Sequence, residues 1–174
     1  MKTLLKLSPL CALLLSIGSF VLLMVTPALT NTYTVLGKTI TDFYSAFAVI
    51  FGKGQASLLS VLVDYEGTLA WSALLAWIFV GAAALLLLIS FIGALLKNKS
   101  AKKFSGLIAL LSAGLLLAAG IFLFFTKAAF YGANGLSTND SYQLGAGWII
   151  AAILALAGGL FSLLPATLTI ISKK

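Results

Sequence analysis

Residues 69–96 read LAWSALLAWIFVGAAALLLLISFIGALL, and this stretch contains no charged side chain. An α-helix rises about 1.5 Å per residue and the hydrocarbon core of a bilayer is about 30 Å thick, so roughly 20 apolar residues can cross it. Three further stretches meet this criterion: 7–25, 104–126 and 146–171. The sequence therefore predicts four transmembrane helices in a single integral membrane domain that covers residues 1–174.

The composition supports this prediction and excludes several functions. Of the 174 residues, 61% are hydrophobic and 9% are charged, whereas about 25% of the residues in a soluble domain are charged. The chain has no histidine, and Cys11 is its one cysteine. This excludes histidine-based catalysis and a Cys/His metal cluster. We therefore expect no catalytic residue, no metal and no cofactor.

The lysines predict how the chain is oriented. Cytoplasmic segments of membrane proteins carry an excess of lysine and arginine. Placing both termini in the cytoplasm puts eight of the eleven lysines on that side: Lys2, Lys6, Lys97, Lys99, Lys102, Lys103, Lys173 and Lys174. We therefore predict a cell-membrane protein with an inner loop at 97–103 and outer loops at 27–68 and 127–145. The net charge of +7 is explained by topology, without a nucleic-acid partner. An alternative is that the first span is a signal peptide that is cleaved.

The first outer loop contains more pattern than the second. Residues 30–35 are rich in β-formers. Apolar residues then recur at helical spacing up to Gly52, which predicts an amphipathic helix on the membrane surface: Ile40, Phe43, Tyr44, Phe47, Ile50 and Phe51. The apolar stretch 58–63 is interpreted as a re-entrant or interfacial turn, and the second outer loop as turns. The predicted fold is all-α: a four-helix transmembrane bundle, capped by a first extracellular loop that contains an interfacial helix.

Two groups of residues are candidates for contacts. The outer-surface candidates are Phe43, Tyr44, Phe47, Asp64 and Glu66. We expect the two acids to stabilise the start of the second span through its helix dipole. The helix-packing candidates are small residues at helical spacing, which let helices approach closely in lipid: Ser105, Ala109, Ala113, Ala151, Ala155 and Gly159. They serve packing within the bundle, with a partner subunit as the alternative.

Two resemblances follow from this layout. The order of spans and loops resembles the claudin-type tetraspan plan, but the W-G-L-W…C…C signature of that family is missing, so no residues carry over. The segment Phe47–Gly52, which includes I-F-G, is similar to an element of small, uncharacterised four-span membrane proteins of low-GC Gram-positive bacteria. This second resemblance implies a bacterial source and brings no activity with it.

Three function classes remain. The first is a non-enzymatic structural or accessory protein that works through helix packing and its outer loop, in contact with the lipid bilayer and with another integral membrane protein or a second copy. The alternative is a pore or transporter subunit for a neutral or apolar solute. Its polar lining would come from the serines of the spans: Ser72, Ser90, Ser105, Ser112 and Ser162. A membrane-embedded enzyme acting on lipid would depend on the acids: Asp42, Asp64, Glu66 and Asp140.

Overall fold

Four long helices dominate the computed structural model, which describes residues 2–95, 99–136 and 141–171. They are α1 (Lys2–Val25), α3 (Trp71–Leu95), α4 (Lys99–Phe124) and α6 (Ala146–Ile171). Each is long and apolar enough to cross a membrane. The predicted spans are thus present as helices, although α1 begins five residues before the predicted span and α4 ends two residues early. Residues 97 and 98 of the predicted inner loop lie outside the described residues.

The four helices form a closed ring in which α1 packs on α3, α3 on α4, α4 on α6 and α6 on α1. Small residues allow two of these helices to approach closely. A Cβ atom added at Gly120 of α4 would lie 2.6 Å from Cγ of Leu156 on α6. Close approach at glycine and alanine is the usual basis of helix association in lipid. The bundle core is accordingly built largely from alanine, together with Val80, Leu87 and Leu116.

The prediction of an all-α fold is wrong, because an antiparallel five-stranded sheet joins the two loops at one end of the bundle. Its strands are β1 (Leu29–Val35), β2 (Lys38–Tyr44), β3 (Lys53–Leu58), β4 (Val61–Glu66) and β5 (Gln143–Leu144). The spatial order is β4-β3-β2-β1-β5. The fifth strand comes from the second loop, so the sheet ties the two loops together.

Two-residue turns close both hairpins of the sheet. Leu36 and Gly37 join β1 to β2, with φ angles of 49° and 76°, and Leu59 and Ser60 join β3 to β4, with φ angles of 51° and 64°. Positive φ at both central residues is typical of the turns that match the twist of a hairpin. The interpretation of 58–63 as a re-entrant turn is therefore wrong, since these residues form the β3–β4 hairpin.

The predicted interfacial helix is shorter than expected. Ile40, Phe43 and Tyr44 belong to β2, and α2 comprises only Ala46–Phe51. Ser45 begins this helix by accepting a hydrogen bond from the backbone N–H of Ala48, and Gly52 ends it with a φ of 75°. A serine side chain at this position satisfies one of the free donors of a helix start. The second loop also contains more than turns, because α5 (Thr126–Asn134) precedes β5.

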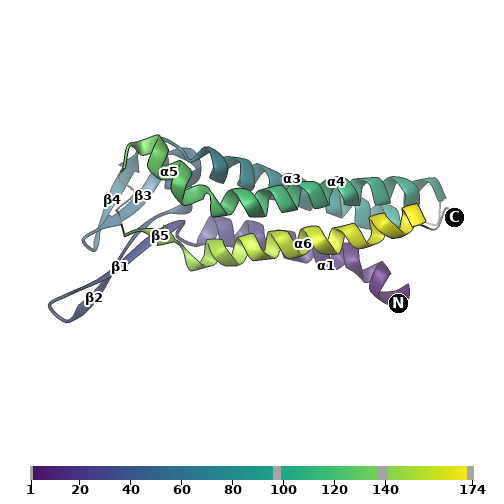
Figure 1. Cartoon of the computed structure of the whole chain (residues 1–174), viewed down its shortest axis with the longest axis horizontal. Coiled ribbons are helices and arrows are strands. Elements are labelled where there is room, and N and C mark those ends of the chain that lie inside the picture. The colour runs from purple at the N-terminus through teal and green to yellow at the C-terminus, as the bar shows by residue number, and fades with distance from the viewer. Residues whose placement is uncertain (1, 96–98, 137–140, 172–174) are drawn as a thin grey trace.

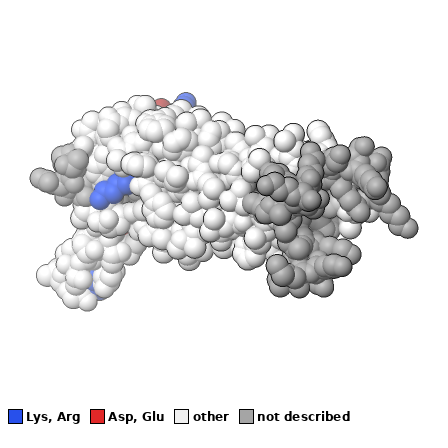
Figure 2. All heavy atoms as spheres, turned by 45° about the vertical axis from the view of Figure 1, so that its right-hand side comes forward, with Lys and Arg blue, Asp and Glu red and all other residues white. Residues whose placement is uncertain are grey.

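Figure 1 shows the sheet at one end of the bundle, with its two hairpins extending past the ends of the long helices. The start of α1 and the end of α6 both lie at the opposite end of the bundle from the sheet. In Figure 2, the described surface along the middle of the bundle carries no coloured charged group, and the blue and red atoms lie towards the sheet end. An uncharged belt around a ring of apolar helices is what a hydrocarbon environment requires.

Candidate functional site: the sheet and its apolar strip

Asp42 holds the two hairpins of the sheet together. Strands β2 and β3 pair at only two positions, Phe43 with Ser57 and Tyr44 with Ala56, and Asp42 lies at the point where they separate. Its carboxylate accepts hydrogen bonds from the backbone N–H groups of Leu59 and Ser60, at 2.9 and 3.0 Å. The side chain is only 4% exposed. Asp42 therefore fixes the turn of the β3–β4 hairpin.

The same carboxylate accepts one bond from within each hairpin. The hydroxyl of Tyr33, on β1 of the hairpin that contains Asp42, donates to it at 2.9 Å, and the hydroxyl of Ser57, on β3 of the facing hairpin, donates to it at 3.3 Å. Burial raises the pKa of Asp42, but the four hydrogen bonds outweigh this effect and hold the pKa below its ordinary value of 3.8. A carboxylate that accepts several hydrogen bonds is stabilised in its charged form. Asp42 is thus a structural group, with its oxygens occupied.

An aromatic cluster seats the sheet on the bundle. The ring of Tyr44 on β2 lies 5.2 Å from Tyr65, 5.0 Å from Phe130 and 5.2 Å from Tyr142, measured between centroids. These rings come from two strands, from α5 and from the segment before β5. Phe130 is fully buried. Ring pairs at such separations add stability beyond the area that they bury, so the cluster fixes the sheet to the helices.

The cluster continues outward as an exposed apolar strip. Tyr65, Val63 and Val61 alternate along β4 and therefore share one face of the sheet. Leu58 pairs directly with Val61, so it lies on the same face. The apolar strip, defined as Leu58, Val61 and Val63, is 43%, 59% and 37% exposed. Apolar side chains that continue a buried face into solvent indicate a contact surface.

The predicted outer-surface residues are not brought together. Phe43, Asp64 and Glu66 lie on the face of the sheet opposite the strip, as the strand pairing places them. Glu66 forms an exposed ion pair with Lys53 at 3.4 Å. Tyr44 belongs to the aromatic cluster, and Phe47 lies on α2 with 52% of its side chain exposed. Asp64 and Glu66 belong to β4 rather than to the start of α3, so the expected helix-dipole role is wrong.

The sequence signals the strip only as the apolar run Leu58–Val63. Its division into two strands depends on the turn at Leu59 and Ser60, which contains neither glycine nor asparagine. Asp140 lies outside the described residues, and so do three residues of its loop, 137–139.

The predicted helix-packing residues lie in the α4–α6 region of the bundle. Ala109, Ala113, Ala151 and Ala155 are at most 1% exposed. A Cβ atom added at Gly159 would lie 2.9 Å from Cγ of Leu117 and 3.2 Å from the carbonyl oxygen of Ala113. Ser105 instead faces α3. Its hydroxyl donates to the carbonyl oxygen of Ser90 at 2.7 Å, and that of Ser90 donates to the carbonyl oxygen of Ser105 at 3.0 Å.

Further serine hydroxyls join other helix pairs. Ser162 on α6 donates to the carbonyl oxygen of Ala109 on α4 at 2.6 Å, and Ser19 on α1 donates to that of Ala151 on α6 at 2.8 Å. Ser112 donates to the carbonyl oxygen of Ile108 in its own helix. Hydrogen bonds between helices stabilise bundles in lipid. The hydroxyls of Ser162 and Ser19 therefore connect helices, whereas that of Ser72 is buried without a hydrogen-bond partner among the described residues.

The chain is a multi-pass membrane protein with a β-sheet at one end of its helices. Among the residues that the structure describes, no group of three His, Cys, Asp or Glu side chains is arranged to hold a metal. No protein-family model matches the sequence, and no curated protein matches it either.

Proposed function

We propose that this protein is a non-enzymatic accessory protein of the cell membrane, which binds another integral membrane protein through the apolar strip. The carrying observation is that Leu58, Val61 and Val63 are exposed on a rigidly held hairpin beyond the ends of the helices. Asp42 and the aromatic cluster fix this hairpin, so little conformational entropy is lost on binding. A partner anchored in the same membrane is already confined to the plane in which the strip lies.

The orientation is part of the proposal. The start of α1, the end of α3, the start of α4 and the end of α6 lie opposite the sheet, and these helix ends carry or adjoin eight of the eleven lysines. The positive-inside rule then places the sheet outside the cell. The test is a single cysteine at Ser60, in a Cys11→Ala background, treated with a membrane-impermeant thiol reagent. Labelling in intact cells supports the orientation, and labelling only after lysis contradicts it.

The partner is tested by affinity purification from native membranes in mild detergent, with the co-eluting proteins quantified. We expect a stoichiometric membrane protein with the parent chain. The Val61→Thr/Val63→Thr variant keeps β-branched side chains but removes apolar surface, and it should retain about tenfold less partner. Leu62→Thr is the matched control, because Leu62 is on the same strand but the opposite face. Equal recovery with all three chains would contradict the proposed docking face.

The accessory role is favoured over the two alternatives by the bonding of the polar groups. A pore for a neutral or apolar solute would take its polar lining from free hydroxyls along the bundle interior, whereas those of Ser90, Ser105 and Ser162 bond to neighbouring helices. The hydroxyl of Ser112 bonds to its own helix, so Ser72 is the one candidate whose hydroxyl has no partner among the described residues.

A lipid-acting enzyme would need two or more carboxylates gathered at the interface, whereas the oxygens of Asp42 accept four hydrogen bonds and Glu66 is paired with Lys53. Asp64 is then the one exposed, unpaired carboxylate among the described candidates. Neither chemistry is supported by the arrangement of these side chains.

A further inference from the structure

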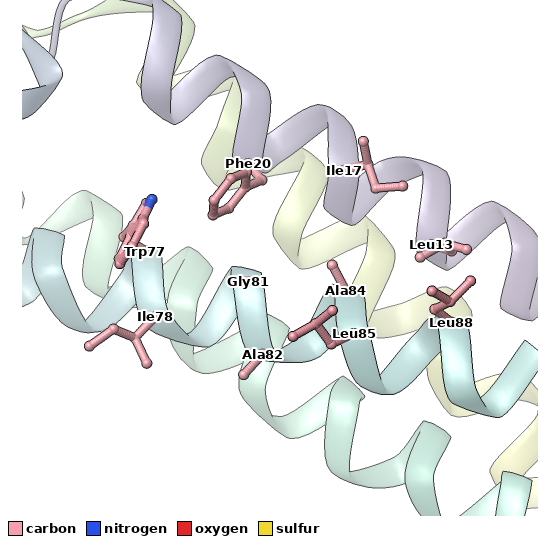
Figure 3. A pocket seen from close by; sticks show the side chains of 10 residues that line it. All are labelled: Leu13, Ile17, Phe20, Trp77, Ile78, Gly81, Ala82, Ala84, Leu85 and Leu88. Carbon is pink, nitrogen blue, oxygen red and sulfur yellow. The ribbon is translucent and has the colours of Figure 1, made fainter.

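An apolar cavity of about 620 Å³ opens between α1 and α3. Figure 3 shows its walls: Leu13, Ile17 and Phe20 from α1 face Trp77 and the following turns of α3. Gly81 lies at the middle of the cavity wall. A Cβ atom added there would lie 3.4 Å from the ring of Phe20, so the missing side chain widens the cavity at this point. We call this cavity the α1–α3 groove. It lies within the apolar helices, away from the apolar strip of the sheet.

The depth of the groove matches one leaflet of a bilayer. Helix α3 ends at Leu95, just before the lysine-rich stretch of the sequence at 97–103. Counting a hydrocarbon thickness of about 30 Å back from Leu95 places the other boundary near residue 75. Trp77 then lies just inside the boundary on the sheet side, and Leu88 lies about 16 Å deeper. The groove therefore runs from the interface to the middle of the membrane.

The width of the groove decides between two possible occupants. A volume of about 620 Å³ over this length corresponds to a mean cross-section of about 40 Å², whereas a helix of 10–12 Å diameter needs roughly 80–110 Å². The groove therefore cannot enclose a helix from a partner, which could insert only its side chains. An extended hydrocarbon chain is one methylene wide, and it is the component of the surrounding medium that fits.

Trp77 supplies the polar end of the site. Its indole Nε1 is buried and has no hydrogen-bond partner among the described residues, and Figure 3 shows this nitrogen on the side of the ring that faces α1. The ring is held between Phe20, at 5.8 Å, and Phe51 of α2, at 5.4 Å. An N–H group in a membrane needs an acceptor, since no water is present to provide one. The ester carbonyl that heads an acyl chain is an acceptor at this depth.

We propose that the α1–α3 groove binds one acyl chain of a membrane glycerolipid from the leaflet on the sheet side. The indole ring of Trp77 turns to open its buried Nε1 to the groove, where this N–H donates a hydrogen bond to the ester carbonyl oxygen. The chain extends past Gly81 towards Leu13 and Leu88. Phe51 of α2 packs edge-on against the ring of Trp77 at 5.4 Å, and the exposed ring of Phe47 lies 5.8 Å from that of Phe51. The site is independent of the docking face proposed above.

The test uses the full chain in phosphatidylcholine nanodiscs that contain a phosphatidylcholine with a photoreactive diazirine in one acyl chain. After illumination, the labelled residues are mapped by mass spectrometry. We expect labels to concentrate in the segments around Ile17 and Leu85, at least fivefold above those at Leu110 and Ile121, which are exposed on α4. Equal labelling of all exposed apolar residues would overturn the proposal, because it describes ordinary contact with bulk lipid.

Two variants separate filling of the groove from the hydrogen bond. Ala84→Phe places a ring in the groove and should remove most of the concentrated labelling, while Gly114→Phe is its control, because Gly114 faces open space on α4. Trp77→Phe keeps an aromatic ring but lacks the N–H, and it should lower the labelling by about two- to tenfold. Unchanged labelling in Trp77→Phe would overturn the role of Nε1 even if Ala84→Phe failed to fold.

A second probe distinguishes the source of the chain. A free fatty acid with the same diazirine, added to unlabelled nanodiscs, should label the groove more weakly than the phosphatidylcholine. Groove labelling by the fatty acid alone would contradict a glycerolipid as the occupant.

Discussion

The side-chain amide of Asn134, the last residue of α5, exchanges two hydrogen bonds with the backbone of Thr68, the second residue beyond β4. The N–H of Thr68 donates to Oδ1 of Asn134, and Nδ2 of Asn134 donates to the carbonyl oxygen of Thr68, each at 2.8 Å. Oδ1 also accepts a bond from the hydroxyl of Tyr65 at 2.8 Å, and Nδ2 donates to the carbonyl oxygen of Phe130 at 2.9 Å. This one amide joins the second loop to the end of β4 and the start of α3.

Replacing Asn134 is therefore expected to loosen the sheet. Asn134→Ala removes all four bonds, and each contributes about 0.5–1.5 kcal/mol when intact. We expect a lower thermal midpoint in detergent and faster proteolysis of the β3–β4 hairpin. Asn31→Ala on β1 is the control of the same residue type. Equal midpoints for the two variants would show that the Asn134 amide does not hold the sheet.

The stability of the sheet should depend on pH through Asp42. Its pKa is lowered in the folded protein, so its stabilising effect is complete above the ordinary pKa of about 4 and is lost as the pH falls through the lowered value. The thermal midpoint of the parent chain should drop below about pH 5. At neutral pH, Asp42→Asn should lower the free energy of unfolding by about 1–3 kcal/mol, because donors are left without their acceptor. Its thermal midpoint should also fall less than that of the parent chain at acidic pH.

Asp64→Asn is the matched control for Asp42, since it removes a negative charge from an exposed position on β4. If the thermal midpoints of the parent chain and of Asp42→Asn changed in parallel with pH, the carboxylate of Asp42 would not be the group that makes the sheet sensitive to acid.

Gly159 should tolerate no larger side chain. Leucine at this position would press on Leu117 and on the backbone of Ala113, and overpacking of this kind costs about 1–3 kcal/mol. Gly114→Leu adds the same side chain on α4, where nothing lies within 4 Å. We expect a lower thermal midpoint for Gly159→Leu only. If the Gly159→Leu midpoint equals that of the parent, the close packing of α6 against α4 is wrong.

The two hydroxyl oxygens of Ser90 and Ser105 lie 3.0 Å apart, and this contact should appear as a coupling energy. A double-mutant cycle with alanine at each position is expected to give about 0.6 kcal/mol, the average for such bonds in membranes. Ser112→Ala is the control, because that hydroxyl bonds to its own helix. Additive effects of the two substitutions would mean that the two hydroxyls do not stabilise each other, and no loss of stability from either substitution would mean that the serines do not stabilise the α3–α4 contact.

The spans were predictable because lipid requires long uninterrupted apolar stretches, and 69–96 has no charge at all. The sheet was not. Ile40, Phe43, Tyr44 and Phe47 recur at helical spacing, yet the first three belong to β2. Their state is decided by pairing with β1 and β3 and by burial of Tyr44 in the aromatic cluster, neither of which is a local property. Tertiary contacts commonly override local propensity in this way.

The site was harder to predict for the same reason. Asp42 was noted only as an acid of the outer loop, and its partners Leu59 and Ser60 lie 17 and 18 residues further along the chain. Asn134 lies 66 residues from Thr68 and carried no signal of its own. A hydrogen bond between distant residues leaves no periodicity in a single sequence.

The central claim, that the apolar strip docks a membrane partner, is tested most directly by site-specific photocrosslinking in native membranes. A photoreactive amino acid is placed at Val61 in one chain and at Leu62 in another, so the two probes share a strand and differ only in the face they occupy. The account predicts one stoichiometric crosslinked membrane protein from position 61 and little from position 62. Crosslinks of equal yield from both positions, or a protein captured only from position 62, would contradict it.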